Sequence, residues 1–136
     1  MPQEIKIGYK ALVDTAKSEI KEYTAEEAVA LAKNPDVVLV DIRDPRELAR
    51  DGTVPGAFHC TRGMLEFWID PESPYYKPVF GEDKTFIFFC AGGLRSALAT
   101  KTAQDMGLKP VAHIIGGFGA WKKAGGQIQQ CAQAGA

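Results

Sequence analysis

The strongest constraint on the fold comes from two apolar segments that each end in a polar or reactive residue. Residues 37–41 are apolar until Asp41, and residues 85–90 place four consecutive apolar side chains before Cys90. A half-exposed strand alternates apolar and polar side chains, whereas a strand buried on both faces shows an unbroken apolar run. These segments therefore predict two central strands of a sheet covered on both faces, with polar chemistry beginning at their carboxyl ends.

Helical patterns alternate with these strands along the chain. Thr24 and Glu27 have the spacing of a capping box. Asp44 precedes Pro45 at a typical helix start, and Gly107 is a typical helix stop. We expect helices at residues 9–20, 24–34, 45–50 and 96–106 and around Trp121, a short helical or irregular segment at 64–68, and further strands at 58–61 and 111–115. This order predicts an α/β fold of three layers, an open, mostly parallel sheet of four to five strands with helices on both faces.

Length and composition bound the class of protein. A chain of 136 residues with 46% hydrophobic residues is expected to form one globular domain with its own core. The net charge of −1, from 16 basic and 17 acidic residues, gives no general field that would attract nucleic acid or an anionic membrane. The longest apolar runs are far shorter than the roughly 20 residues of a membrane span, and no signal-peptide apolar segment precedes the first helix, so we expect a cytosolic protein.

The cysteines and histidines do not form a metal-binding pattern. Three cysteines, an odd number, favour reduced thiols over a disulfide framework. Neither histidine has a second donor at ligand spacing, so we expect neither a metal nor another cofactor. Four of these residues have simple structural interpretations: Cys60 as a small buried residue, Cys131 as incidental in a tail, His59 as a hydrogen-bonded structural residue and His113 as sheet packing.

The segment after the second apolar strand is the candidate site. Cys90 is followed by a short loop of Ala91, Gly92, Gly93, Leu94, Arg95 and Ser96, and then by a helix. In open parallel sheets, ligands bind beyond the carboxyl ends of the strands. Adjacent glycines let the loop turn its amides inward, and the helix N-terminus adds its dipole at the same point. A lone strand cysteine is usually only a small buried residue, but this loop favours a thiolate nucleophile.

Four motifs in order extend this interpretation to a family. Residues 90–96, Cys-Ala-Gly-Gly-Leu-Arg-Ser, resemble the active-site loop of rhodanese-like domains, which often read C-x-x-G-x-R-S. Residues 38–47 are similar to the early vDvRxxxE segment of that family, residues 52–57 to its GHIPGA turn, and residues 116–121 to its GGxxxW motif. The resemblance covers about residues 24–125, which leaves an N-terminal helical extension at 1–23 and a C-terminal tail at 126–136.

The resemblance implies a rhodanese fold and a sulfurtransferase activity. Cys90 would accept a sulfane sulfur as a persulfide from thiosulfate or another persulfide and pass it to a thiol or other nucleophile. The amides of residues 91–96 would bind the anion. The implied partners are a small sulfur donor or a persulfide-carrying protein, without nucleic acid or membrane, and the chain would be a monomer or homodimer.

Two alternatives remain open within this family. One is a cysteine-dependent phosphatase of the same fold, and the other is a non-catalytic sulfur-relay or regulatory binding module. The loop has four residues between Cys90 and Arg95, one fewer than the phosphatase branch has. A shorter loop leaves less room for a tetrahedral phosphate, which favours sulfur chemistry. Because residues 91–94 carry no charge, we expect thiosulfate to be a poor donor.

Several other residues are candidates for support of the site. Arg95 either adds to the positive field of the loop or points outward to a carboxylate that braces it. Arg43 and Glu47 are expected to form a structural ion pair, with Asp44 as a helix cap. Aromatic and apolar residues at 64–76, Trp68 among them, either form a wall beside the loop or fill the core under an insertion. Asp70 is the candidate leaving-group acid for a phosphatase.

Overall fold

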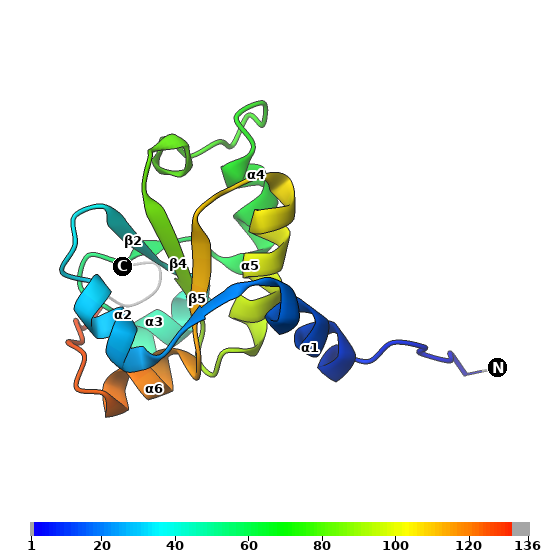
Figure 1. Ribbon diagram of the computed structural model, residues 1–136, viewed down its shortest axis with the longest axis horizontal. Helices are drawn as coiled ribbons and strands as arrows, with labels where there is room; N and C mark the ends of the chain where they lie inside the picture. The colour runs from blue at the N-terminus through cyan, green and yellow to red at the C-terminus, as the bar shows by residue number, and fades with distance from the viewer. Residues whose placement is uncertain (1, 132–136) are drawn as a thin grey trace.

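A five-stranded parallel sheet forms the centre of the molecule in the computed structural model, which describes residues 2–131. The strands are β1 (Lys21–Tyr23), β2 (Val37–Asp41), β3 (Phe58–His59), β4 (Thr85–Phe89) and β5 (Val111–Ile114), and their order in the sheet is β1-β5-β4-β2-β3. All four pairings are parallel. The carboxyl ends of all five strands therefore point to one edge, where the loops that follow them gather (Figure 1).

Helices cover both faces of this sheet. The described helices are α1 (Tyr9–Glu19), α2 (Ala25–Leu31), α3 (Pro45–Asp51), α4 (Leu65–Ile69), α5 (Leu94–Met106) and α6 (Gly117–Lys123), with 3₁₀ turns at Arg62–Met64 and Pro78–Gly81. Figure 1 shows α4 and α5 on one side of the strands and α2 and α6 on the other. The α/β class, the three layers and the two-sided burial that the apolar strands predict are confirmed.

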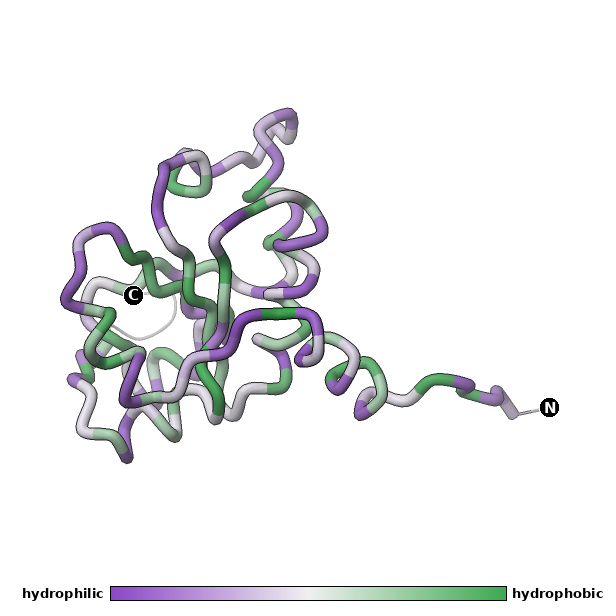
Figure 2. Tube along the Cα trace, in the orientation of Figure 1, coloured by the Kyte–Doolittle hydropathy of each residue, from purple (hydrophilic) through white to green (hydrophobic). Residues whose placement is uncertain are grey.

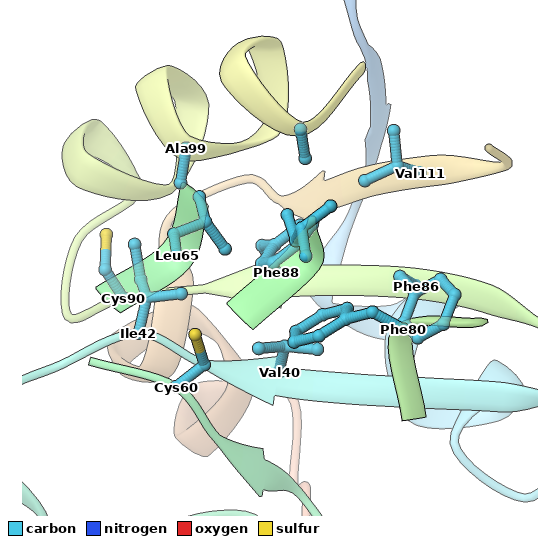
Figure 3. Packing of buried hydrophobic residues seen from close by; sticks show 12 residues of the cluster. Val40, Ile42, Cys60, Leu65, Phe80, Phe86, Phe88, Cys90, Ala99 and Val111 are labelled. Atoms are coloured by element: carbon cyan, nitrogen blue, oxygen red, sulfur yellow. The ribbon is translucent and has the colours of Figure 1, made fainter. Parts of the chain in front are cut away.

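The two faces of the central strand β4 build two separate cores. Phe86 and Phe88 belong to a cluster with residues of α4 and α5, and Figure 3 shows Phe88 next to Leu65 and Phe86 next to Phe80. Ile87 and Phe89 point the other way, into a cluster with residues of α2 and α6. All four β4 side chains are at most 1% exposed. Burial of each contributes about 1.5–3 kcal/mol, which explains why an unbroken apolar run is required here. Figure 2 shows these apolar strands at the centre, with hydrophilic stretches around them.

Local signals place most helix ends as expected. Thr24 and Glu27 form the capping box of α2, and Asp44 caps α3 in the same way with Glu47. The helix after the candidate loop begins at Leu94, two residues earlier than predicted, because Gly93 takes a left-handed conformation with φ +99° and caps it.

Two segments differ from expectation. The three-residue edge strand β1 was not predicted, since Lys21–Tyr23 is short, polar and lies directly between two helices. The C-terminal tail predicted at 126–136 is anchored over its first part: Gln129 forms an antiparallel bridge with Thr53, and the Trp121 indole donates to the Gln127 carbonyl. Backbone pairing rather than apolar burial holds this part, and composition gives no signal for it. Residues 132–136 of the tail lie outside the described residues.

Candidate active site

The sulfur of Cys90 sits at the base of the loop that leaves β4. The backbone N–H groups of Gly93 and Ser96 donate to Sγ, at 3.1 and 3.3 Å, and the residue is 1% exposed. The thiol in turn donates to Ser96 Oγ at 3.5 Å. Both amides come from the start of α5, where N–H groups have no partner within the helix. A sulfur that carries negative charge is thus met by two aimed N–H dipoles and the helix N-terminus.

The glycine-rich turn before α6 supports the loop from behind. Phe118 N donates to the Cys90 carbonyl at 2.8 Å, and Gly119 N donates to the Ala91 carbonyl at 3.1 Å. Gly117 has φ +60° and lies against the backbone of Cys90 and Ala91, so there is no space for a side chain at this position. The final glycine motif therefore fixes the backbone position of the cysteine.

Arg95 points outward and braces the loop through a carboxylate. Its two terminal nitrogens donate to both Glu47 oxygens, each at 2.9 Å, in a bidentate pair between α5 and α3. The Asp44 N–H also donates to Glu47, at 3.0 Å. Of the two orientations that the sequence leaves open, the structure has the bracing one. The positive field at the sulfur comes mainly from backbone amides.

Glu47→Gln is expected to lower the free energy of unfolding near neutral pH but not in acid. The hydrogen bond from Arg95 holds the pKa of Glu47 below its ordinary value of 4.5. A carboxyl with a depressed folded-state pKa stabilises the fold above the unfolded pKa, and this contribution is lost as the pH falls through the folded pKa. Urea unfolding of wild type and variant from about pH 7 to about pH 3 should therefore show a difference that is full above about pH 5 and shrinks in acid. A difference independent of pH would contradict this role of the pair.

The prediction of an ion pair between Arg43 and Glu47 is wrong. Arg43 is 1% exposed and pairs with Asp41, donating to Oδ2 at 2.8 Å and to Oδ1 at 3.0 Å. It also donates to the Gly52 carbonyl at 2.7 Å, and its guanidinium lies 4.3 Å from the centre of the Phe118 ring. Arg43 pairs with Asp41 rather than with Glu47 because the Arg43 and Asp41 side chains both leave the end of β2 into the same enclosed space. Arg43 therefore links three segments behind the site and has no contact with the sulfur.

A second hydrogen-bonded group lies on the other side of the sulfur. Ser96 Oγ is 2.9 Å from His113 Nδ1, and His113 Nε2 is 2.8 Å from Glu22 Oε2. His113 is 1% exposed, and burial lowers the pKa of its imidazole against the opposing effect of Glu22. Sequence reasoning assigned His113 to packing and missed Glu22, because Glu22 lies on the unpredicted β1. The position of His113 inside the otherwise apolar strand Val111–Ile114 was the signal in the sequence that could have indicated a buried polar group.

Within residues 64–76, the side chains of Leu65 and Trp68 pack in the core instead of forming a wall beside the Cys90 loop. Trp68 packs edge-to-face on Phe58 with ring centres 5.9 Å apart, and Leu65 is fully buried in the same cluster. Tyr75 is 58% exposed, within the segment that enters the amino end of β4, opposite to the candidate loop (Figure 1). The apolar surface next to the loop comes instead from Leu94, which lines a depression of about 280 Å³ together with residues of α1, namely Tyr9, Lys10, Val13, Asp14 and Lys17.

The remaining candidates have structural roles. Asp70 accepts from the Glu72 N–H in the turn after α4, away from the loop. His59 Nε2 lies 2.7 Å from the Arg43 carbonyl, as expected for a hydrogen-bonded structural histidine. Burial raises the pKa of the Cys60 thiol to about 12, which keeps it protonated and agrees with a small buried residue.

Residues 2–131 contain neither a metal-binding cluster nor a membrane-spanning helix. No group of three or more His, Cys, Asp or Glu side chains there is arranged to hold a metal ion. No helix in that range combines the length and the apolar character needed to cross a membrane.

Comparison with known proteins matches the part of the chain that contains all four motifs. The sequence model of the rhodanese-like domain matches residues 24–124. This chain belongs to the rhodanese-like family. Among curated relatives, the putative sulfurtransferase YtwF of Bacillus subtilis is 30% identical over 105 residues, which cover 76% of this chain and 92% of that protein. Thiosulfate sulfurtransferase GlpE of Coxiella burnetii is 26% identical over 102 residues, 75% and 87% of the two chains.

Solved structures agree with this assignment of the rhodanese-like domain. A protein of unknown function from Rhodopseudomonas palustris, described as a possible tyrosine phosphatase, is 69% identical with a TM-score of 0.92, over 95% of this chain and 99% of that one. The homodimeric polysulfide-sulfur transferase of Wolinella succinogenes is 29% identical with a TM-score of 0.69, over 94% and 91%. The family therefore supports a sulfurtransferase, while one similar structure carries a phosphatase description.

Proposed function

We propose that this rhodanese-like domain transfers a sulfane sulfur through a persulfide on Cys90. The observation that supports this most directly is the sulfur itself, which receives the Gly93 and Ser96 N–H groups at the start of α5. These amides stabilise the thiolate before the reaction and the persulfide anion after it. The same site therefore serves both half-reactions.

Each half-reaction is a displacement at sulfur. The Cys90 thiolate attacks the sulfane sulfur of the donor, the donor's S–S bond breaks, and sulfite leaves from thiosulfate or a thiolate leaves from a persulfide. An acceptor thiolate then attacks the outer sulfur of the Cys90 persulfide, and the Cys90 thiolate is the leaving group. No external oxidant or reductant is required.

The charge distribution of the loop favours a persulfide as donor. Residues 91–94 carry no charged side chain, and the guanidinium of Arg95 is held by Glu47. A doubly charged donor such as thiosulfate thus meets backbone amides but no free cationic side chain of the loop. Leu94 adds an exposed apolar side chain, 53% exposed, beside the loop. This combination fits a persulfide on an organic thiol better than a small dianion.

A cysteine-dependent phosphatase is the second candidate, because the similar Rhodopseudomonas palustris protein is described as a possible tyrosine phosphatase. Three features of this chain count against it. The loop has only four residues between Cys90 and Arg95, and Arg95 is tied to Glu47 rather than turned toward the sulfur. The acid candidate Asp70 is engaged in a turn after α4.

Intact mass measurement tests the proposal. Reduced wild type, Cys90→Ser and Cys60→Ser are each exposed to thiosulfate and, separately, to a persulfide of a low-molecular-weight thiol. We expect wild type and Cys60→Ser to gain one sulfur atom that dithiothreitol removes, faster from the persulfide than from thiosulfate, and Cys90→Ser to gain none. If wild type takes up sulfur from neither donor, sulfur transfer is contradicted. Cys90-dependent hydrolysis of an aryl phosphate would favour the phosphatase. Loading without repeated turnover to a thiol acceptor would indicate a relay or binding module.

A further inference from the structure

A continuous line of hydrogen bonds runs from the sulfur of Cys90 to a carboxylate at the edge of the sheet. It passes from Cys90 Sγ to Ser96 Oγ at 3.5 Å, to His113 Nδ1 at 2.9 Å, and from His113 Nε2 to Glu22 Oε2 at 2.8 Å. The residues come from the loop after β4, from α5, from β5 and from β1, which lie next to one another in Figure 1. Nothing in the sulfur-transfer step described above requires His113 or Glu22.

The backbone fixes this line at both ends. Glu22 and His113 are directly opposite each other in the parallel pairing of β1 and β5, so their side chains project on the same side of the sheet. Ser96 is held by its own N–H, which donates to the sulfur at 3.3 Å. Ser96 and His113 are at most 1% exposed. Because these two side chains are buried, they hydrogen-bond to each other and to their protein neighbours rather than to bulk solvent.

The hydrogen-bonding roles along the line can be assigned from the neutral state of His113. Glu22 is a carboxylate and can only accept, so His113 Nε2 carries the hydrogen and donates to it. His113 Nδ1 is then the unprotonated nitrogen and accepts from the Ser96 hydroxyl. With its hydrogen directed to His113, Ser96 Oγ accepts from the Cys90 thiol. Each side-chain donor of this line therefore points away from Cys90 and toward Glu22, while the two backbone amides donate to the sulfur.

We propose that His113 takes up the proton of the Cys90 thiol through the Ser96 hydroxyl, with Glu22 holding the imidazole in the orientation and tautomer that accept it. The inference rests on the proposed role of Cys90 as the nucleophile. His113 and Glu22 are then positioning residues of the site, and Ser96 is the group that carries the proton from Cys90 to His113.

The proton balance of this step is simple. The S–H bond of Cys90 breaks as a new O–H bond forms at Ser96, and the original Ser96 hydrogen passes to His113 Nδ1. The products are a thiolate at Cys90 and an imidazolium at His113, which donates from both nitrogens. Ser96 then donates to the sulfur anion, in addition to the two backbone amides. The reverse transfer returns the proton to the Cys90 thiolate after sulfur has left.

The charges that face His113 support this direction. Burial lowers the pKa of His113, and Glu22, on β1, opposes this with a negative charge directly at Nε2 that favours the imidazolium. Lys17, on α1, lies 3.8 Å from the same Glu22 carboxylate and opposes it, but its side chain is 41% exposed and therefore screened by water. From α5 the groups are the hydroxyls of Ser96 and of Thr100, and Thr100 donates to the Ala112 carbonyl. Glu22 is therefore the dominant charge at the imidazole.

The pH profile of Cys90 alkylation measures this step without any sulfur donor. The rate of iodoacetamide addition is followed by intact mass in a Cys131→Ser background, since Cys131 is partly exposed. For His113→Asn and Glu22→Gln we expect an alkylation profile shifted upward by about one pH unit, so that the rate falls by about tenfold at about pH 6.5. At about pH 10, where the thiolate forms without help, the variant and wild-type rates should converge.

Two controls separate the relay from a merely structural role. Glu19→Gln removes a nearby carboxylate that pairs with Lys101 rather than with His113, and should leave the profile unchanged. Ser96→Ala keeps the backbone N–H but removes the hydroxyl that carries the proton. As a single variant it should shift the profile, and adding His113→Asn to it should cause no further shift. Additive effects of Ser96→Ala and His113→Asn would contradict the relay.

The possible results also separate this inference from the proposed function. If Cys90 is unreactive in folded wild type, it is not a nucleophile, and both the relay and the proposed sulfur transfer are contradicted. A reactive wild type whose profile is unchanged in Glu22→Gln, an isosteric variant on a partly exposed edge strand, would overturn the relay and leave sulfur transfer standing. A rate lowered equally at every pH would indicate a distorted loop instead of a lost proton acceptor.

Discussion

Arg43→Ala is expected to be among the most destabilising substitutions in this rhodanese-like domain, lowering the free energy of unfolding by about 3–5 kcal/mol. The substitution leaves the Asp41 carboxylate, which is not exposed, without its charged partner. It also removes the hydrogen bond to the Gly52 carbonyl and the contact with the Phe118 ring. Urea denaturation followed by circular dichroism measures the change.

Two comparisons make this expectation specific to the buried charge. The double variant Asp41→Asn with Arg43→Met removes both charges and should be more stable than Arg43→Ala alone, since no unpaired carboxylate remains. Arg46→Ala removes an arginine from an exposed pair with Asp44 and should have a much smaller effect. An Arg43→Ala variant as stable as wild type would mean that Asp41 is protonated or hydrated in the folded protein.

The central part of the fold could be predicted because its signals are local. Unbroken apolar runs at 37–41 and 85–90 require burial on both faces, and the structure alternates Phe86 and Phe88 with Ile87 and Phe89 between two cores. Capping residues such as Asp44 act within one helical turn, so their spacing is visible in the sequence. Cys90 could be singled out because a strand, a glycine loop and a helix start follow one another directly in the chain.

Features that depend on contacts distant in the sequence could not be predicted in the same way. Strand β1 forms because Lys21–Tyr23 pairs with the edge of β5. The three residues themselves show no strand pattern that would predict this pairing. The partner of Arg95 is Glu47, 48 positions away, and that of His113 is Glu22, 91 positions away. Arg43 showed the opposite error: Glu47, across the following helix start, was the expected partner, and Asp41, at the end of β2, is the partner in the structure.

These long-range contacts converge on the loop that carries Cys90. Arg95 and Glu47 hold its outer side, Ser96 and His113 lie on the α5 side, and the turn before α6 holds its backbone from behind. The loop that carries Cys90 is therefore supported from three directions, of which the loop sequence encodes only its own amides. The support from behind is the most rigid, because it acts between backbones.

Gly117→Ala is expected to reduce the reactivity of Cys90 by about 100-fold, because small misplacements of reacting groups cost that much. Gly117 has φ +60°, and an added Cβ would meet the Cys90 carbonyl oxygen and lie 2.8 Å from the Ala91 carbonyl carbon and oxygen. All three contacts are backbone atoms, which cannot rotate away as a flexible side chain does. The turn must therefore separate from the loop, breaking the bonds from Phe118 N and Gly119 N. The amides that face the sulfur move with it.

Two alanine variants at other glycines isolate the cause. In Gly119→Ala, the new Cβ would have only an ordinary contact of 3.7 Å with the Ala91 oxygen, so near wild-type reactivity is expected. In Gly56→Ala the added Cβ meets nothing within 4 Å, but φ is +79°, so only the backbone strain of about 1–2 kcal/mol should appear. Iodoacetamide alkylation at about pH 10, where the thiolate forms in every variant, reports the loop geometry, and urea unfolding reports the stability. Equal alkylation rates for Gly117→Ala and Gly119→Ala would mean that the turn before α6 does not position Cys90.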